Sequence, residues 1–278
     1  MHRYPVPPAW GGAIEGWARA LSAAGRSDQT IETRTEAIRR FARQIGAPSP
    51  ALVSRSRLIE WAGAHEWSRE TRRSMYASIR GFYSWTTGAG ICTDDPTDAL
   101  PTIKPGPAVP RPAPEDVYRS ALREADDRAR VVLRLAGESG LRRSEIAGIR
   151  REDMTRDLAG WSLLVHGKGG RPRIIPLSDS VAREVLRRFA TVPGPWLFPS
   201  STGGHLTARH LARVTRRYLS DGWTLHTLRH RFATRAYSGS NDLLTVRDLL
   251  GHVSVATTQR YVRPPDDGMR AAIRGAAV

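Results

Sequence analysis

The most informative stretch of the sequence is His226-Thr-Leu-Arg-His-Arg-Phe232. His226 and Arg229 stand three positions apart, so they share one face of a helix or of the turn that leads into it. His230 points to another side, and we interpret it as a structural residue. The segment therefore predicts a helix that presents an imidazole and a guanidinium side by side.

A second cation stands upstream, in Gly140-Leu-Arg-Arg-Ser-Glu-Ile-Ala-Gly-Ile-Arg150. The glycine turn places Arg142 at the start of a short helix, and helix starts favour anions. Glu145, three residues further on, is positioned to orient the Arg142 guanidinium. Alone this pattern is weak, because arginine is common throughout the chain.

Downstream, Leu250-Gly-His252 is typical of a helix that stops at a glycine. Ser254 can cap the next helix, and Tyr261 lies on it, nine residues after His252. A lone tyrosine on such a helix is more often a packing residue, so spacing alone does not identify Tyr261 as a nucleophile.

A β-hairpin is predicted between these motifs. Trp161 to His166 forms one strand, Gly167-Lys-Gly-Gly170 the turn, and Arg173 to Leu177 the returning strand. A phosphate-binding loop would need Gly-x-x-x-x-Gly-Lys-Ser/Thr leading into a helix, which this turn does not match. A lysine at the tip of a hairpin can instead reach into a DNA groove, and Lys168 is one of only two lysines among 43 basic residues.

The composition favours a polyanionic partner. The net charge is +16 over 278 residues, and most of the excess lies after residue 100. The single cysteine, Cys92, supplies neither a disulfide nor a zinc cluster. No stretch has the length of a membrane span or the pattern of a signal peptide, so we expect a cytoplasmic protein that binds nucleic acid and no membrane.

Proline divides the chain. Six prolines between 101 and 114 exclude a continuous helix or strand, which predicts a linker. Arg73 and Arg80 share one helical face before it; that face either contacts DNA or is ordinary solvated surface. We expect a mainly α fold with a small antiparallel sheet (α+β), divided into a helical domain (1–100), the linker (101–113) and a mixed domain (114–278). The helices expected in the first domain cover about 10–24, 27–45, 55–65 and 70–86.

Cleavage of a DNA phosphodiester without a metal needs fixed cations on the phosphate oxygens, a nucleophile in line and a proton donor for the leaving 5′-oxygen. The sequence offers a candidate for each part. Together they resemble the tyrosine site-specific recombinase/phage integrase family: Gly-Leu-Arg-x-Ser-Glu, a hairpin Gly-Lys-Gly, His-x-Leu-Arg-His, Leu-Gly-His and a final tyrosine, all in order. Ser27 to Thr30 followed by Phe41 resembles the start of the family's core-binding helical domain, so the likeness spans nearly the whole chain.

The resemblance implies a role for each site residue. Tyr261 would attack the scissile phosphate and leave a 3′-phosphotyrosyl link, while Arg142 and Arg229 clamp the phosphate oxygens. His226 would assist deprotonation of the tyrosine and bond to the phosphate, and Lys168 would be the general acid. His252 would support the transition state, and no cofactor or metal is implied. Arg143 and Arg231 depart from the usual family pattern, and each could add a contact to a DNA phosphate.

The resemblance also implies an assembly. Two domains would clamp double-stranded DNA from opposite sides, and four protomers would assemble on two sites. The residues after Tyr261, 262–278, would dock on a neighbouring protomer. We expect the short form without an arm-binding domain, acting in a bacterial host to integrate or excise a phage-like mobile element.

Three alternatives stay open. A Xer-like resolvase of DNA dimers shares the chemistry and differs only in its sites. A type IB topoisomerase shares the cleavage step without a partner site. A DNA-binding regulator that never cuts is of another class, and it would be expected to have lost some of the site residues.

Overall fold

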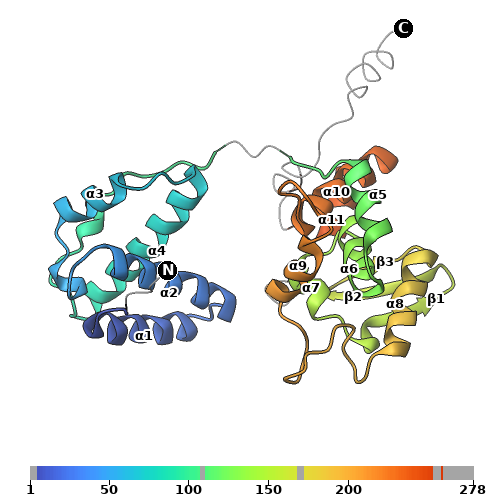
Figure 1. Ribbon diagram of the computed structural model, residues 1–278, viewed down its shortest axis with the longest axis horizontal. Helices are drawn as coiled ribbons and strands as arrows, with labels where there is room; N and C mark the ends of the chain where they lie inside the picture. Colours follow the sequence, from blue (N-terminus) through green and yellow to red (C-terminus); the bar gives the residue numbers. More distant parts are fainter. Residues whose placement is uncertain (1–4, 107–109, 168–171, 253–257, 259–278) are drawn as a thin grey trace, which may run out of the picture. The chain divides into compact units, whose positions relative to one another are not determined.

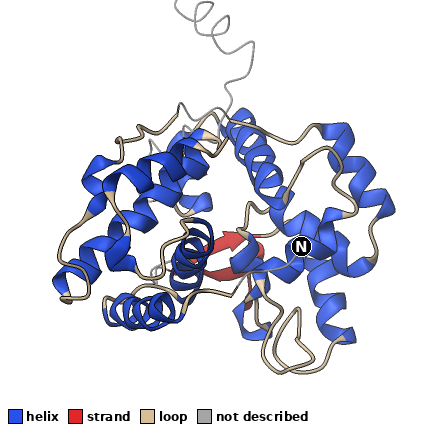
Figure 2. Ribbon diagram, turned by 60° about the vertical axis from the view of Figure 1, so that its left-hand side comes forward, coloured by secondary structure: helices blue, strands red, loops and turns tan. Residues whose placement is uncertain are grey.

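The computed structural model describes residues 5–106, 110–167, 172–252 and 258. The chain divides into two compact units, residues 1–107 and 108–278, and each is described by itself (Figure 1). Helices dominate both units, and the small sheet belongs to the second (Figure 2). The expected α+β fold class is therefore confirmed.

The N-terminal unit contains the four expected helices. Serine side chains cap two of them: Ser54 accepts from the backbone N–H of Arg57, and Ser68 accepts from that of Thr71. The four helices are α1 (Pro8–Ala23), α2 (Asp28–Gln44), α3 (Arg55–Gly63) and α4 (Arg69–Gly88), and two 3-10 turns cover Pro50–Leu52 and Pro96–Ala99.

Aromatic side chains fill the core of this unit. The rings of Trp10 and Phe82 stack with centroids 5.9 Å apart, and Phe41 meets Trp10 edge-on at 5.6 Å. The indole N–H of Trp10 donates to the carbonyl of Ala47 at 2.9 Å, so the burial of this polar group is compensated. Burial of large rings from α1, α2 and α4 holds these helices together.

The C-terminal unit is built on α6 (Asp127–Gly137), most of whose residues are buried. In the part of this unit that the structure describes, the other elements are α5 (Glu115–Glu124), α7 (Arg143–Ala147), β1 (Met154–Asp157), β2 (Gly160–His166), β3 (Pro172–Pro176), α8 (Asp179–Thr191), α9 (Ala208–Arg216), α10 (Leu225–Ser240) and α11 (Leu243–Leu250), with a 3-10 turn at Arg151–Asp153.

The sheet is antiparallel with the order β1-β2-β3. Leu163 of β2 pairs with Ile175 of β3, and both side chains enter the core. The hairpin of β2 and β3 confirms the prediction. The first strand, β1, was not predicted; it pairs Met154 with Leu163 and extends the sheet by four residues.

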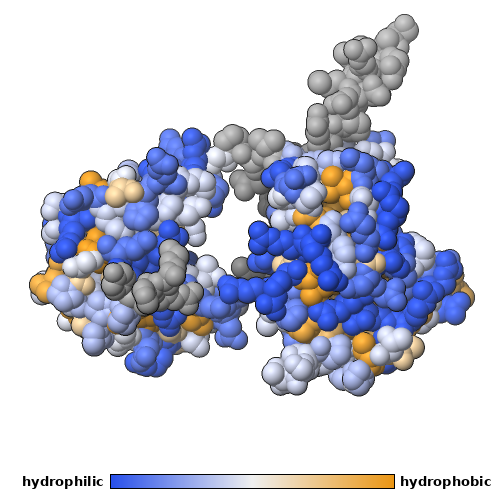
Figure 3. Space-filling view, in the orientation of Figure 1, coloured by the Kyte–Doolittle hydropathy of each residue, from blue (hydrophilic) through white to orange (hydrophobic). Residues whose placement is uncertain are grey.

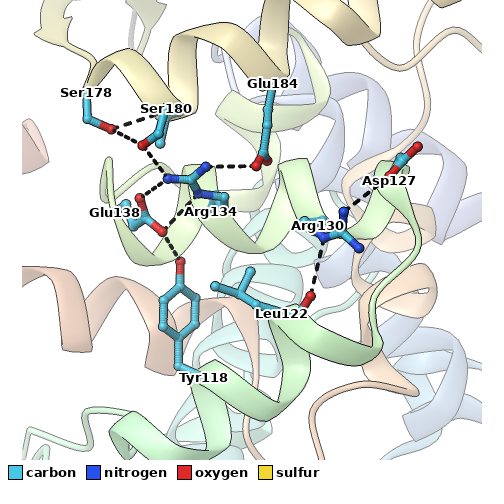
Figure 4. Close-up of polar contacts among 10 residues, drawn as sticks. Tyr118, Leu122, Asp127, Arg130, Arg134, Glu138, Ser178, Ser180 and Glu184 are labelled. Atoms are coloured by element: carbon cyan, nitrogen blue, oxygen red, sulfur yellow. Dashed lines mark hydrogen bonds and ion pairs between the residues drawn. The ribbon is translucent and has the colours of Figure 1, made fainter.

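A group of polar contacts joins three helices of this unit (Figure 4). The Arg134 guanidinium donates to both carboxylate oxygens of Glu138, at 3.0 and 2.7 Å, and to Glu184 at 2.8 Å. The Tyr118 hydroxyl donates to Glu138 at 2.7 Å. Because these side chains are largely withdrawn from water, their bonds are charge-assisted and orient α5 and α8 on α6.

Two glycines with positive φ end the segments that meet at the polar site described below. Gly140 (φ 66°) turns the chain into α7, and Gly251 (φ 62°) ends α11. A Cβ on Gly140 would lie 2.3 Å from the Phe232 ring, so only glycine lets α10 approach this turn. Gly251 confirms the predicted helix stop.

Candidate active site

Arg229 lies at the centre of the site and is 1% exposed. Its Nη1 donates to the carbonyl of Gly140 at 2.5 Å, and its Nη2 donates to the carbonyl of Leu250 at 2.7 Å. A buried guanidinium needs such acceptors, because taking an unpaired charge out of water is costly. Arg229 therefore joins α10 to the turn before α7 and to the end of α11.

Arg142 occupies the N-cap position of α7. Its backbone N–H donates to Glu145 Oε2 at 2.8 Å, and its Nη1 donates to Oε1 of the same carboxylate at 2.7 Å. Its Nη2 lies 3.3 Å from the carbonyl of Gly251. The predicted contact of Glu145 with the Arg142 guanidinium is present, and Arg142 stays partly exposed to solvent while its orientation is held.

Glu145 binds a further arginine that the sequence did not single out. Arg173 of β3 donates to both carboxylate oxygens at 2.9 Å, and Arg229 Nη1 lies 3.9 Å away. Burial by itself would raise the pKa of Glu145, but the hydrogen bonds from Arg173 and Arg142 outweigh it, and the pKa lies below its usual value. A single anion therefore stabilises three neighbouring guanidinium groups.

His252 follows α11 and is 8% exposed. Arg229 Nη2 lies 3.0 Å from His252 Nε2; because arginine can only donate, Nε2 accepts. His252 Nδ1 then carries the proton and donates to the Thr258 hydroxyl at 3.0 Å. Burial and the charge of Arg229 lower the pKa of His252 to about 3, so its ring is neutral at pH 7.

His226 lies on the first turn of α10, and the Nε2 atoms of His226 and His230 are 3.2 Å apart. Burial, together with the Arg229 charge, lowers the pKa of His226. For His230, burial and the neighbouring His226 lower the pKa to about 4. Both rings are therefore neutral at pH 7, so one donates to the other.

A hollow of about 760 Å³ opens beside these groups. Arg142, His226 and Arg229 line it, together with the exposed residues Arg143 and Arg216. Figure 3 shows strongly hydrophilic side chains gathered over α7 and α9. The site combines a cationic wall with neutral imidazoles, an arrangement that can bind an anionic group and stabilise charge that develops on it.

Two predicted site residues, Lys168 and Tyr261, lie outside the described residues. Among the residues that the structure describes, Arg142, His226 and Arg229 line one hollow, and His252 touches Arg229. Sequence reasoning missed Arg173, Arg216 and Thr258. The sequence held no local signal for Arg173, because its partner Glu145 lies 28 residues away.

Arg231 was predicted to contact a DNA phosphate; the structure shows protein partners for its guanidinium, and the DNA contact stays a prediction. Its guanidinium is buried and donates twice to Glu115 at 2.9 Å, and once to the carbonyl of Gly137 at 2.8 Å. It also stacks on the Tyr118 ring, 3.9 Å from the centroid. Arg231 therefore holds α10 on α5 and α6, and its charge is already compensated.

The other proposed DNA contacts differ in their surroundings. Arg143 is exposed and lines the hollow. Arg73 is exposed and pairs with Glu70 at 2.9 Å. Arg80 instead donates to the carbonyls of Leu100 and Pro101, at 2.6 and 3.1 Å, so it holds the start of the linker. DNA contact by Arg73, Arg80 and Arg143 stays a prediction.

No helix in the described part of the chain is long and apolar enough to cross a membrane. No group of three or more His, Cys, Asp or Glu side chains there has the arrangement of a metal site.

Comparison with known proteins identifies the class. Residues 114–267, more than half of the chain, match the phage integrase family. The chain is 34% identical over 226 residues to tyrosine recombinase XerD of Caulobacter vibrioides, covering 72% of each protein. It is 30% identical over 278 residues to tyrosine recombinase XerD of Rhizobium meliloti, covering 89% of this chain and 88% of the relative.

Solved structures agree on the fold. XerH site-specific recombinase bound to a palindromic difH substrate superposes with a TM-score of 0.70 at 19% identity, covering 95% of this chain and 83% of that one. A lambda integrase tetramer bound to a Holliday junction gives 0.71 at 16% identity, covering 92% and 79%. The chain belongs to the phage integrase family. It is a tyrosine recombinase, an enzyme that cleaves and rejoins DNA at specific sites.

Proposed function

We propose that this recombinase is an integrase that inserts and excises a phage-like mobile element through a 3′-phosphotyrosyl intermediate. The observation that carries the chemistry is the joint placement of Arg142 and Arg229. Both are held by Glu145 or by main-chain carbonyls, and both line the hollow that His226 lines. We assign the scissile phosphate to this hollow.

The two arginines act as the phosphate clamp. Their guanidinium groups are held before DNA binds, so little reorganisation is needed when charge grows on the non-bridging oxygens. Arg229 is withdrawn from water, which strengthens its interaction with a phosphate oxygen. Arg142 is partly exposed and reaches the phosphate from the solvent side.

Tyr261 is the proposed nucleophile and Lys168 the proposed general acid that protonates the leaving 5′-oxygen. The 5′-hydroxyl of a partner strand then attacks the phosphotyrosine and restores the DNA backbone. His252, neutral and bonded to Arg229, holds that guanidinium and supports the transition state. The covalent link conserves the phosphodiester energy, so neither ATP nor metal enters the proposed cycle.

The proposed partner is double-stranded DNA, bound by both units, with four protomers on two sites. The tetrameric lambda integrase on a Holliday junction and the DNA-bound XerH supply the precedent for this fold. We propose that residues 1–100 form the core-type DNA-binding domain, that 101–113 link it to the catalytic domain, and that residues 262–278 dock on a neighbouring protomer. We place the reaction in the bacterial cytoplasm.

A Xer-type resolvase of DNA dimers is the second candidate, because relatives at 30–35% identity carry the names XerC and XerD. Sequencing of the DNA captured covalently on Tyr261 in the host separates the two. An integrase should be trapped at the junctions of one mobile element with the chromosome. Capture at a single chromosomal site that is present without any element would overturn the integrase proposal in favour of the resolvase.

Cleavage itself is tested with a nicked suicide duplex that carries the captured sequence. The wild-type chain should accumulate a covalent DNA adduct, and Tyr261→Phe should accumulate none while still binding the duplex. Absence of any adduct with the wild type would support a regulator that does not cut. Adducts without joining of two sites would support a topoisomerase.

A further inference from the structure

We propose that His230 is a positioning residue: it sets the ring tautomer of His226, and the backbone N–H of Arg111 in the linker sets the tautomer of His230. The proposal rests on the function proposed above, since it concerns how His226 meets the phosphate. It replaces the interpretation of His230 as a merely structural residue, and it connects the linker to the active site within one unit.

The first step is the contact between the linker and α10. The backbone N–H of Arg111 donates to His230 Nδ1 at 3.3 Å. A backbone N–H can only donate, so His230 Nδ1 must present its lone pair. A protonated Nδ1 on His230 would place two donors against each other at this point.

The second step fixes the other nitrogen of His230. With Nδ1 as acceptor, the neutral ring carries its proton on Nε2. That atom lies 3.2 Å from His226 Nε2, so His230 donates and His226 accepts. The depressed pKa of His230, about 4, agrees with a ring that stays neutral under working conditions.

The third step concerns His226. Because its Nε2 accepts from His230, its proton is on Nδ1. His226 lines the hollow, and in this tautomer it acts on a bound phosphate as a hydrogen-bond donor from Nδ1. It cannot at the same time accept a proton from a tyrosine at Nδ1. The relay therefore assigns His226 to phosphate binding in preference to the role of general base.

The linker residue is held in place by further contacts. The Arg111 guanidinium stacks over the Trp223 ring, 4.5 Å from the centroid, and its Nη2 lies 3.5 Å from the carbonyl of Asp221. The backbone N–H of Ala113 donates to the carbonyl of Thr227 at 3.0 Å. Residues 111–113 therefore lie against the N-terminal part of α10, which carries His226, and are held there by hydrogen bonds.

The decisive test reads the tautomer directly. Long-range 1H–15N correlation spectra of the full chain labelled with [15N]histidine distinguish an Nδ1–H ring from an Nε2–H ring. His226 is identified by the signal that disappears in His226→Gln. We expect His226 as the Nδ1–H form and His230 as the Nε2–H form at pH 7. An Nε2–H ring at His226 would overturn the relay, even if the protein cleaves DNA as proposed.

The linker contact is tested by a matched pair of variants. Arg111→Pro removes the backbone N–H, whereas Arg111→Ala removes the guanidinium and keeps the N–H. We expect Arg111→Ala to retain the wild-type tautomer of His226. Arg111→Pro should mix the tautomers and slow cleavage of the suicide duplex by about 10-fold to 100-fold, the effect seen when a metal-bound histidine loses the partner that orients its ring. Equal tautomers and equal rates in the two variants would contradict the proposal.

A second pair separates positioning from packing. His230→Gln places an N–H near the position of Nε2 and keeps a donor for His226. His230→Asn keeps an acceptor near the position of Nδ1, so it retains the linker contact and loses the donor. The relay predicts faster cleavage by His230→Gln than by His230→Asn at equal DNA binding. A purely structural role, in which His230 only anchors the linker, predicts the reverse order.

Discussion

Arg173 of β3 and Glu145 of α7 form a bidentate ion pair, in which each Nη of the guanidinium lies 2.9 Å from a different carboxylate oxygen. The same carboxylate also accepts from the Arg142 side chain and main chain. The hairpin is thereby attached to the helix whose N-cap is Arg142, one of the two arginines proposed to bind the phosphate. A substitution of Glu145 therefore affects both β3 and α7.

We expect Glu145→Gln to destabilise the chain and slow cleavage while DNA binding persists. The neutral amide leaves three guanidinium groups without their shared anion, and breaking a buried ion pair costs about 3–5 kcal/mol. Non-specific DNA binding should not weaken, because the substitution removes a negative charge. Urea denaturation, cleavage of the suicide duplex and DNA titration measure the three properties. A variant with wild-type stability would contradict the central role given to this carboxylate.

Lys168→Arg tests the proposed role of Lys168 as general acid. Arginine preserves the positive charge but does not release its proton near neutral pH, so DNA binding should persist while cleavage falls by about 10²- to 10⁴-fold. A duplex with a 5′-bridging phosphorothiolate has a leaving group that needs no proton. Cleavage of that duplex should recover in Lys168→Arg. Full cleavage of the ordinary duplex by this variant would rule out the assigned role.

Arg143 and Arg231 should separate DNA binding from stability. Arg143 is exposed at the hollow, so Arg143→Ala should weaken DNA binding and reduce the log–log salt slope by about 0.9 per lost phosphate contact. Arg231→Met removes the bonds to Glu115 and Gly137 and should cost about 1–3 kcal/mol of unfolding free energy. Its salt slope should match the wild type. A reduced slope in Arg231→Met would show that Arg231 contacts DNA.

Gly140→Ala should lose stability and activity together. The left-handed backbone adds about 1–2 kcal/mol for a residue with a Cβ, and contact with Phe232 adds about 1–3 kcal/mol of overpacking. Gly204→Ala is the matched control, because Gly204 has a similar φ of 68° and no atom within 4 Å of the added Cβ. Thermal or urea unfolding of both variants isolates the packing contribution. Equal losses would mean that Phe232 moves away without cost.

Acid should destabilise the C-terminal unit before most carboxylates titrate. Burial and nearby arginines lower the pKa of His252 to about 3, and burial and His226 lower that of His230 to about 4, from an unfolded value of 6.5. Below pH 6.5 these histidines are protonated in the unfolded chain but stay neutral in the folded chain. The free energy of unfolding is therefore unaffected by them above pH 6.5 and declines as pH falls below it. At pH 5 each histidine should remove about 2 kcal/mol.

Urea denaturation at pH 7, 6 and 5 measures this decline. His230→Gln removes one of these groups, so its stability should decline less than that of the wild type over that range. The variant His205→Gln serves as the control, because His205 is exposed. An identical pH dependence in His230→Gln and the wild type would contradict the depressed pKa of His230.

Much of the fold could be predicted because it depends on local pattern. Apolar residues at helical spacing mark α2 and α4, and the glycine turn marks the β2–β3 hairpin. Strand β1 escaped prediction because its four residues are mostly exposed and carry no alternation of apolar side chains. Its partner in the sheet, not its own composition, makes it a strand.

The site was predictable only in its motifs. Arg142 and Arg229 follow from short patterns, but their relationship depends on contacts across the fold. Arg173 lies 28 residues from Glu145, and Arg231 lies 116 residues from Glu115. No local pattern distinguishes such a buried arginine from one on the surface of so basic a chain. The pairing of Arg173 with Glu145 and that of Arg231 with Glu115 therefore became visible only in the folded structure.

The burial of Arg229 has a practical consequence for anyone who wants an inactive version of this enzyme. Because its guanidinium joins α10 to the carbonyls of residues 140 and 250, replacing it removes a structural contact as well as a group proposed to bind the phosphate. In cells we expect an Arg229 variant to be present in a lower amount than the wild type, so a loss of recombination would reflect both less folded protein and less activity per molecule. Tyr261→Phe removes only the hydroxyl of the proposed nucleophile, and comparison of protein abundance in the two variants measures how much of an Arg229 defect is missing protein.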